Sequence, residues 1–394
     1  MKHLFATCCL PLCLHVQGQW AHTNNPNAQI NCVAVEDAVV IAGTAGTGVF
    51  VSLDHGDTWL ANTSWEDFTS PYIYSTAIDG GVLFAGTVEG VYSSSDQGAS
   101  WAGMNNGIIG TNLAIMDLLV EGPVMFAASG CGVFRSVNSG STWTATNSGL
   151  GASSLNAICR HSTDLFAGSA GTGVFRSTDN GNTWADANNG LTNGNVSDIL
   201  SDGADLYAAT NNGVFRSTDD GASWSAVNNG ILSTNIMEMF AVGGQLFAGS
   251  SGGGVYVSGN NGTSWSTDNV GLSNMAVTSF AANDTYLFAG TTNNGIPGDV
   301  YRRAVPTAVA EIGSASSLSI YPGVTDGPLT IEDRAAVPSN RTLLVVDALG
   351  RDVSSLSLGR SASTTVDLAG APGVYLVAVF ADGQCLASAR VVKE

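Results

Sequence analysis

"STDNGNTW", residues 177–184, is one of six segments in this chain that share the pattern Ser-x-Asp/Asn-x-Gly-x-x-Trp. The other five are SLDHGDTW (52–59), SSDQGASW (94–101), SVNSGSTW (136–143), STDDGASW (217–224) and SGNNGTSW (258–265). Their tryptophans follow one another at intervals of 42, 42, 41, 40 and 41 residues. A repeat of about 40 residues with regularly placed turn residues is typical of one four-stranded β-propeller blade. We therefore predict an all-β fold with one blade for each segment.

The residue types within the segment account for it without a ligand. An Asp or Asn at the third position can accept backbone N–H bonds across a tight turn, where the glycine adopts a positive φ. The tryptophan can cover this turn with a large apolar face, so we interpret the segment as structural. The third-position residues are Asp54, Asp96, Asn138, Asp179, Asp219 and Asn260. The tryptophans are Trp59, Trp101, Trp143, Trp184, Trp224 and Trp265.

A second repeated element indicates a seventh blade. Leu-Phe-Ala-Gly-Thr/Ser or a close variant occurs seven times, and its last copy (287–291) runs on to Arg302 without a following segment or tryptophan. The N-terminal stretch QWAHTNN (19–25) supplies the missing part, because its Trp-x-x-x-Asn-Asn spacing also follows Trp184. A ring keeps exposed sheet edges unless its first and last strands pair. We predict a seven-bladed propeller over residues 19–303, closed by Gln19–Thr23 as the outer strand of the blade that contains Leu287–Arg302.

Both ends of the chain differ from the ring. Residues 1–18 have a basic start, an apolar middle and a small-residue end, as expected of a secretory signal peptide. No later window is apolar enough for a membrane helix, so we expect no transmembrane span. Residues 304–316 have the composition of a linker, and residues 317–394 contain short apolar runs divided by turns. That last pattern predicts a small Ig-like β-sandwich.

Charge and cysteine spacing exclude several classes of partner. The formal net charge is −19, with 13 Lys and Arg against 32 Asp and Glu. Such a chain is repelled by nucleic acid and by anionic membranes, so we expect neither as a partner. The cysteines after residue 18 have no metal-binding spacing, and we predict no metal and no cofactor. They are free thiols or form one disulfide: Cys32, Cys131, Cys159 and Cys385.

Candidate binding residues lie where the repeat is broken. Eight residues before the Leu-Phe-Ala element, on the expected innermost strand, three blades carry an acid: Asp117, Asp198 and Glu238. Three acids around one central channel predict a site for a cation or a polyhydroxylated ligand. The alternative is that these carboxyl groups are solvated or hydrogen-bonded to the backbone.

A second break follows the first segment, where residues 65–72 form an insertion. It contains Trp65, Phe68 and Tyr72, and Trp65 is out of register with the other tryptophans. Exposed aromatic rings here would form a stacking surface for a sugar or for a protein side chain. The alternative is that they pack against the neighbouring blade.

The six segments resemble the Asp-box (BNR) repeats of sialidases, sortilin-type receptors, xyloglucan-degrading glycosidases and photosystem II assembly propellers. These families share blades and differ in chemistry, so the resemblance implies the hairpin and not an activity. Sialidase activity would require an arginine cluster and an Arg-Ile-Pro motif, and the sequence has no Arg-Ile-Pro. Four propeller arginines recur at one repeat position, which indicates a role within or between blades: Arg135, Arg176, Arg216 and Arg302. No catalytic residue is predicted.

The C-terminal part is similar to the sorting domain of the type IX (Por) secretion system of Bacteroidetes. The matching segments are Leu318–Pro322 with Asp326-Gly327, Val346–Arg351, Asp367–Ala369 with Pro372–Tyr375, and Arg390–Lys393. Pro322-Gly323-Val324 departs from the Pro-Asn-Pro of that family. The resemblance implies that residues 317–394 engage the type IX machinery and that the protein is secreted or displayed on the outer-membrane surface. An adhesive sandwich domain is the alternative.

The leading hypothesis is a secreted or cell-surface, non-catalytic binding propeller for an extracellular glycan or protein. A glycoside hydrolase-like enzyme acting on extracellular polysaccharide is the competing hypothesis. It would need two carboxyl groups about 5–9 Å apart in one cleft. The sequence singles out no such pair.

Overall fold

The computed structural model describes residues 19–23, 28–61, 68, 70–151, 154–292 and 298–305, together with eight strands between residues 318 and 393. The predicted signal peptide (1–18) and most of the predicted linker lie outside the described residues. The chain divides into two compact units, with the boundary between Pro306 and Thr307. Each unit is described by itself.

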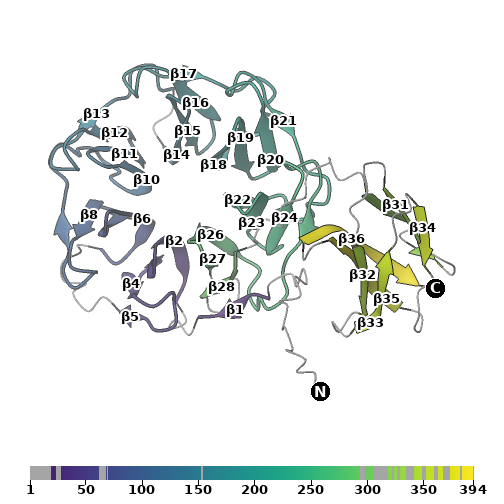
Figure 1. Ribbon diagram of the computed structural model, residues 1–394. Helices are drawn as coiled ribbons and strands as arrows, with labels where there is room; N and C mark the ends of the chain where they lie inside the picture. Colours follow the sequence, from purple (N-terminus) through teal and green to yellow (C-terminus); the bar gives the residue numbers. More distant parts are fainter. Residues whose placement is uncertain are drawn as a thin grey trace. The chain divides into compact units, whose positions relative to one another are not determined.

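The first unit is a seven-bladed β-propeller (Figure 1), as the repeats predict. Each blade is an antiparallel sheet of four strands. From the innermost strand outward, blades 1 to 3 are β2(Ile30–Glu36)-β3(Val39–Thr44)-β4(Val49–Ser52)-β5(Leu60–Ala61), β6(Ile73–Asp79)-β7(Val82–Thr87)-β8(Gly90–Ser94)-β9(Ala102–Gly103) and β10(Ile115–Glu121)-β11(Val124–Ser129)-β12(Gly132–Ser136)-β13(Thr144–Ala145). Blades 4 to 6 are β14(Leu155–His161)-β15(Asp164–Ser169)-β16(Val174–Ser177)-β17(Ala185–Asp186), β18(Val196–Asp202)-β19(Asp205–Thr210)-β20(Gly213–Ser217)-β21(Ser225–Ala226) and β22(Ile236–Val242)-β23(Gln245–Ser250)-β24(Val255–Ser258)-β25(Ser266–Thr267). Blade 7 is β26(Val277–Ala282)-β27(Tyr286–Thr291)-β28(Val300–Ala304)-β1(Ala21–His22).

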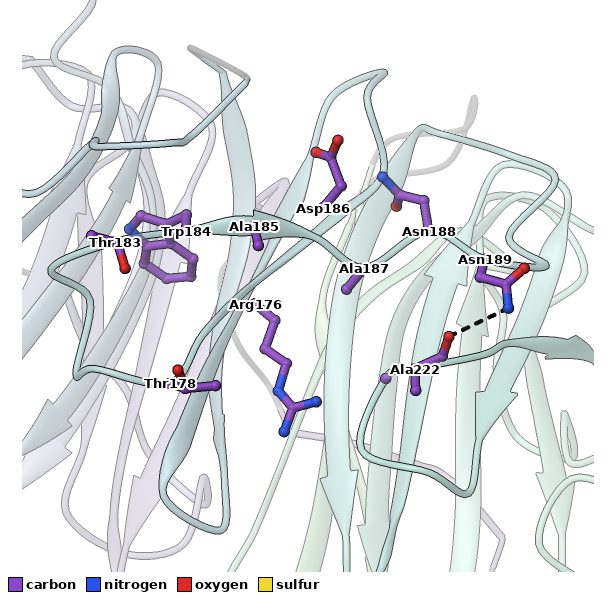
Figure 2. A pocket seen from close by; sticks show the side chains of 11 residues that line it. Arg176, Thr178, Thr183, Trp184, Ala185, Asp186, Ala187, Asn188, Asn189 and Ala222 are labelled. Carbon is purple, nitrogen blue, oxygen red and sulfur yellow. Dashed lines mark hydrogen bonds between the residues drawn. The ribbon is translucent and has the colours of Figure 1, made fainter.

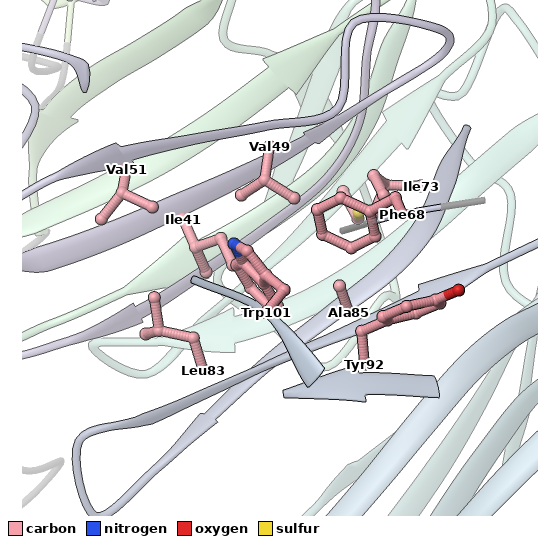
Figure 3. Packing of buried hydrophobic residues seen from close by; sticks show 10 residues of the cluster. Ile41, Val49, Val51, Phe68, Ile73, Leu83, Ala85, Tyr92 and Trp101 are labelled. Carbon is pink, nitrogen blue, oxygen red and sulfur yellow. The ribbon is translucent and has the colours of Figure 1, made fainter. Parts of the chain in front are cut away.

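The innermost strands line the middle of the ring. Each of them contacts the innermost strand of the next blade, and β26 of blade 7 contacts β2 of blade 1. The second strand of each blade is a nearly continuous apolar run, because both faces of the sheet are covered by neighbouring blades. The hydrophobic core therefore consists of layers between blades, such as the layer between blades 1 and 2 in Figure 3.

Each Ser-x-Asp/Asn-x-Gly-x-x-Trp segment forms the corner between the third and fourth strands. In blade 4, Asp179 accepts hydrogen bonds from the backbone N–H and the hydroxyl of Thr183, at 2.8 and 2.6 Å. The Ser177 hydroxyl accepts the N–H of Gly181 at 2.8 Å. Gly181 has a φ of 84°, and the preceding Asn180 is also left-handed, with a φ of 59°. The corner thus contains two successive residues of positive φ, of which the sequence pattern predicted only the glycine.

The segment tryptophans join successive blades through a repeated hydrogen bond. Trp184 donates its indole N–H to the carbonyl of Thr146 in blade 3, three residues after Trp143. Trp224 donates to the carbonyl of Ala187, and Trp265 donates to the carbonyl of Val227, both at 2.8 Å. Each acceptor again lies three residues after the tryptophan of the preceding blade. These three tryptophans therefore tie their corners to the preceding blade.

The N-terminal strand closes the ring, as predicted. β1 pairs antiparallel with β28, with Ala21 opposite Arg302. Trp20 is fully buried and donates its indole N–H to the carbonyl of Asp268, three residues after Trp265. The carbonyl of Thr23, three residues after Trp20, in turn accepts the indole N–H of Trp59 at 3.0 Å. Trp20 therefore takes the place of the tryptophan that blade 7 lacks.

Blade 7 lacks the corner segment in its sequence, and an ion pair is formed at the position of the segment serine. Arg303 stands at the position of the segment serine, and its guanidinium pairs with the buried carboxylate of Asp268 in blade 6. His22 of the closing strand pairs with Asp299, which is buried just before β28. Burial raises the pKa of Asp299 to about 6, and the nearby His22 opposes this shift.

The second unit contains two sheets. One has three strands in the order β29(Leu318–Tyr321)-β31(Leu329–Asp333)-β34(Ser363–Val366). The other has five, in the order β30(Val324–Thr325)-β36(Gln384–Lys393)-β35(Gly373–Ala381)-β32(Arg341–Asp347)-β33(Asp352–Leu358). Leu343, Val345, Val366, Val377 and Val379 are buried, so both sheets contribute to a core. Across both units, no described helix is long and apolar enough to cross a membrane.

Candidate functional site

The three predicted acids lie on the innermost strands β10, β18 and β22, and all line one cavity at the channel. Its volume is about 380 Å³, and its wall also includes Asn31, Tyr74, Met116, Asn156 and Met237. The structure therefore brings together Asp117, Asp198 and Glu238, although more than 120 residues separate the first from the last.

Each of these carboxyl groups is bonded to the backbone of the following blade. Asp117 accepts the N–H of Ile158 in blade 4, and Asp198 accepts the N–H of Met239 in blade 6, both at 2.8 Å. Glu238 accepts the N–H of Phe280 in blade 7 at 3.2 Å. The backbone-bonded alternative considered for the sequence therefore describes these three side chains.

The environment favours the protonated form of these acids. Burial raises the pKa of Asp117 to about 7, and repulsion from Asp198 adds to this effect. Burial raises the pKa of Asp198 to about 6, and it raises the pKa of Glu238 well above the ordinary range. The hydrogen bonds from backbone N–H groups act in the opposite direction. All three residues are half-buried where they line the channel cavity.

The cation interpretation of the channel receives no support from the described residues. Within them, no group of three or more His, Cys, Asp or Glu side chains is arranged to hold a metal ion. Cys32 and Cys159 carry free thiols near the acids, and Cys131 of blade 3 is also a free thiol. Burial raises the pKa of the Cys32 thiol to about 12, so its thiolate form is disfavoured.

The insertion after the first segment divides its aromatic residues between the core and the surface. Phe68 is buried between blades 1 and 2, with ring centroids 4.9 Å from Tyr92 and 5.2 Å from Trp101 (Figure 3). Phe68 is therefore corrected from a candidate ligand-binding residue to a core residue, because its ring fills the gap between two blades. Tyr72 is 47% exposed and packs beside Gly46. Trp65 lies outside the described residues.

A second cavity, of about 390 Å³, lies on the outer rim between blades 4 and 5 (Figure 2). Arg176, Trp184 and Asp186 are among the residues that line it. No feature of the sequence indicated this cavity, because its lining residues belong to the regular repeat and break no pattern.

The recurring arginines are mostly paired with acids. Arg176 and Arg216 bind Asp164 and Asp205 of the same blade, at 2.5 and 2.6 Å. Arg302 reaches across the closing seam to Asp57 of blade 1, at 2.5 Å. These contacts agree with a role within and between blades, and no cluster of three arginines around one ligand position is formed by them.

Comparison with known proteins agrees with this architecture. A family model described as the DUF6242 β-propeller domain matches residues 157–298, which lie in blades 4 to 7. No curated protein matches the chain.

Solved structures share the fold at low sequence identity. PorZ, described as an essential bacterial surface component of the type IX secretion system of Porphyromonas gingivalis, is 15% identical with a TM-score of 0.58, over 93% of this chain and 59% of PorZ. YCF48 bound to D1 peptide is 15% identical with a TM-score of 0.55, over 74% of this chain and 95% of YCF48. An ancestral GH74 enzyme is 14% identical with a TM-score of 0.51, over 95% of this chain and 63% of that enzyme. The chain thus spans less than two thirds of PorZ and of the GH74 enzyme, and what these similarities show is the β-propeller fold.

Proposed function

We propose that the ring is a non-catalytic binding module of a secreted or outer-membrane surface protein, with an extracellular glycan or protein as its ligand. The observation that carries this proposal is the use of the channel carboxyls. Asp117, Asp198 and Glu238 are each engaged by a backbone N–H of the next blade, so they hold blades together. Acids engaged in this way do not form the free acid and base pair that glycoside hydrolysis needs.

The face that carries Tyr72 is the proposed ligand surface. Its ring is about half exposed, directly before the innermost strand of blade 2. An aromatic side chain in this position supplies a flat apolar surface with a polar tip, which suits both sugar rings and protein side chains. Trp65, in the same insertion, remains a candidate from the sequence.

A glycan array and a peptide array, probed with the chain from Gln19 to Glu394, test this function. Tyr72→Ala and Trp65→Ala should lose the bound ligand, whereas Leu232→Ala, at an exposed leucine before the innermost strand of blade 6, should retain it. A hydrolase screen on the bound glycans belongs to the same experiment. If the chain hydrolyses a bound glycan and the Asp117→Ala variant does not, the proposed binding function is wrong and the protein is a glycoside hydrolase.

We further propose that residues 317–394 are an Ig-like sandwich that acts as the type IX sorting domain, and that the corner segments are Asp-boxes. The two C-terminal sheets support a sandwich, and the hydrogen bonds of the corners support the Asp-box assignment. Removing residues 317–394 should leave the ring in the periplasm of a bacterium that has the type IX system. Unchanged export of the shortened chain would contradict the sorting role.

A further inference from the structure

One repeat position of the ring holds an arginine with a different environment in blade 3. Arg135, Arg176 and Arg216 lie on the third strand, opposite an aromatic residue of the second strand. In blades 4 and 5 the second strand begins with an aspartate, and this aspartate binds the arginine. In blade 3 the second strand begins with Val124. Blade 3 therefore has the arginine of the repeat without the aspartate that pairs with it in blades 4 and 5.

The remaining contacts of Arg135 are weak. Its guanidinium lies over the ring of Phe126, 5.9 Å from the centroid. Its Nη1 donates to the side-chain oxygen of Asn182 at 3.5 Å, which is the limit of a hydrogen bond. Its Nε is buried and has no hydrogen-bond partner among the described residues. A partly buried guanidinium with so few partners is costly, and a polar group of this kind calls for an explanation.

Every other arginine of the described ring is ion-paired. These pairs are Arg160–Glu121, Arg176–Asp164, Arg216–Asp205, Arg302–Asp57 and Arg303–Asp268. The chain carries far more acids than bases, so carboxylates are abundant. An arginine without a carboxylate partner is therefore an exception among the described residues of the ring.

A second guanidinium lies beside Arg135. Arg160 of blade 4 lies over the same Phe126 ring, 5.7 Å from the centroid. Its charge is offset by Glu121, which it binds through Nε and Nη2 at 2.6 and 2.7 Å. Of the two guanidinium groups over the Phe126 ring, only that of Arg160 is ion-paired. The ends of Arg135 and Arg160 also reach the same corner of blade 4, through Asn182 and Asn180.

We propose that Arg135 anchors a binding site for a carboxylate group of a ligand, at the outer edge of the seam between blades 3 and 4. The ligand carboxylate would pair with the Nη groups of Arg135, because its Nε is buried. A charge-assisted hydrogen bond between guanidinium and carboxylate is about twice as strong as a neutral one. This site is separate from the Tyr72 face of blade 2, and it stands whether or not that face binds a ligand.

The charge of the whole chain restricts the ligand further. A polyanion would meet repulsion from a net charge of −19. A ligand with one isolated carboxylate is affected mainly by charges within the screening length, about 8 Å at physiological ionic strength. The site therefore fits an isolated carboxylate better than a polymer of acidic residues.

The test uses glucuronate as the probe and glucose as its neutral counterpart. Side-chain Nε–H signals of arginine are followed by NMR in the ¹⁵N-labelled chain from Gln19 to Glu394, and Arg135→Gln assigns the signal of Arg135. We expect glucuronate to shift the Arg135 signal with saturation, whereas glucose leaves it in place. The signals of Arg176 and Arg216 should not move, because their carboxylate partners are already bound.

A reciprocal exchange between two blades makes the test specific. Val124→Asp gives blade 3 the aspartate of blades 4 and 5, and it should weaken glucuronate binding at Arg135 at least tenfold. Asp164→Val removes the aspartate from blade 4, as in blade 3. In this variant glucuronate should shift the Nε–H signal of Arg176. Unchanged melting temperatures of both variants show that the ring stays folded, and the NMR shifts are read directly at each arginine. Absence of any saturable shift at Arg135, or a shift that persists in Val124→Asp, would overturn the proposal.

Discussion

Replacing Trp20 by alanine should open the ring at its seam. The indole of Trp20 is 1% exposed and packs with Phe247, Leu287 and Tyr301 between blades 6 and 7. Truncating a buried tryptophan to alanine costs about 3–5 kcal/mol of unfolding free energy. The substitution also leaves the carbonyl of Asp268 without the indole N–H that it accepts at 2.8 Å, which adds about 1 kcal/mol.

The expected loss for Trp20→Ala is therefore about 5 kcal/mol. In a domain of this size, 1 kcal/mol shifts the melting temperature by about 2 °C, so the shift should be about 10 °C. Trp20→Phe keeps most of the apolar face and loses only the N–H donor, and it should cost about 1–2 kcal/mol. Leu60→Ala, at a 61% exposed position on the outer strand of blade 1, is the control and should change the unfolding free energy by less than about 0.5 kcal/mol.

Hydrogen exchange distinguishes an opened seam from a general loss of stability. β1 pairs with β28 through Ala21 and His22, opposite Arg302 and Tyr301. Trp20→Ala should remove protection at β28 under conditions where β16 of blade 4 remains protected. A melting temperature within 2 °C of the unchanged chain, or undiminished protection of β28, would refute closure by the N-terminal strand.

Three further outcomes are expected. The ring should lose stability as the pH rises from about 4 to about 7, because Asp117, with a pKa near 7, holds a proton in the folded state that the unfolded chain releases near pH 4. Denaturant titrations across this range should show a slope that Asp117→Asn flattens, and an equal slope in both proteins would contradict the assignment. Phe68→Ala should cost about 3 kcal/mol in chemical denaturation, because the ring is buried beside Trp101; a change below 1 kcal/mol would place Phe68 at the surface. Gln97→Asn should raise the melting temperature slightly, because Gln97 has a φ of 60° and asparagine tolerates this conformation better; calorimetry that finds a decrease would show that the glutamine side chain has a favourable role.

The sequence predicted the ring well because its information is local and repeated. The spacing of Trp184 and Trp224 measures the length of one blade, and the residue types around Gly181 specify the corner between two strands. Closure was also predictable, since Trp20 repeats the spacing to an asparagine pair that follows Trp184. In the structure Trp20 makes the same indole hydrogen bond as Trp184.

The candidate site was less predictable because its contacts run between blades. Asp117 could be assigned to an innermost strand, but its bond to the N–H of Ile158 depends on how closely two blades approach. The insertion around Phe68 showed a break in the repeat without showing whether the aromatic ring turns inward or outward. Only the gap between blades 1 and 2, filled by Phe68 against Tyr92, decides that question.

The closing blade shows why a missing repeat element need not weaken the ring. Where other blades place a serine and a turn against the preceding blade, blade 7 places Arg303 against the buried carboxylate of Asp268. A buried ion pair has a high desolvation cost, and removing one partner leaves the other charge uncompensated, at about 3–5 kcal/mol. Such a pair also depends strongly on correct geometry, and here it lies beside Trp20, with the guanidinium of Arg303 5.8 Å from the indole ring. A wrongly placed N-terminal strand would expose or separate these charges, so we infer that the pair selects the correct docking of the strand more than it adds stability. Exchanging both residues for apolar ones of similar size should then keep the melting temperature and reduce the yield of correctly closed rings on refolding.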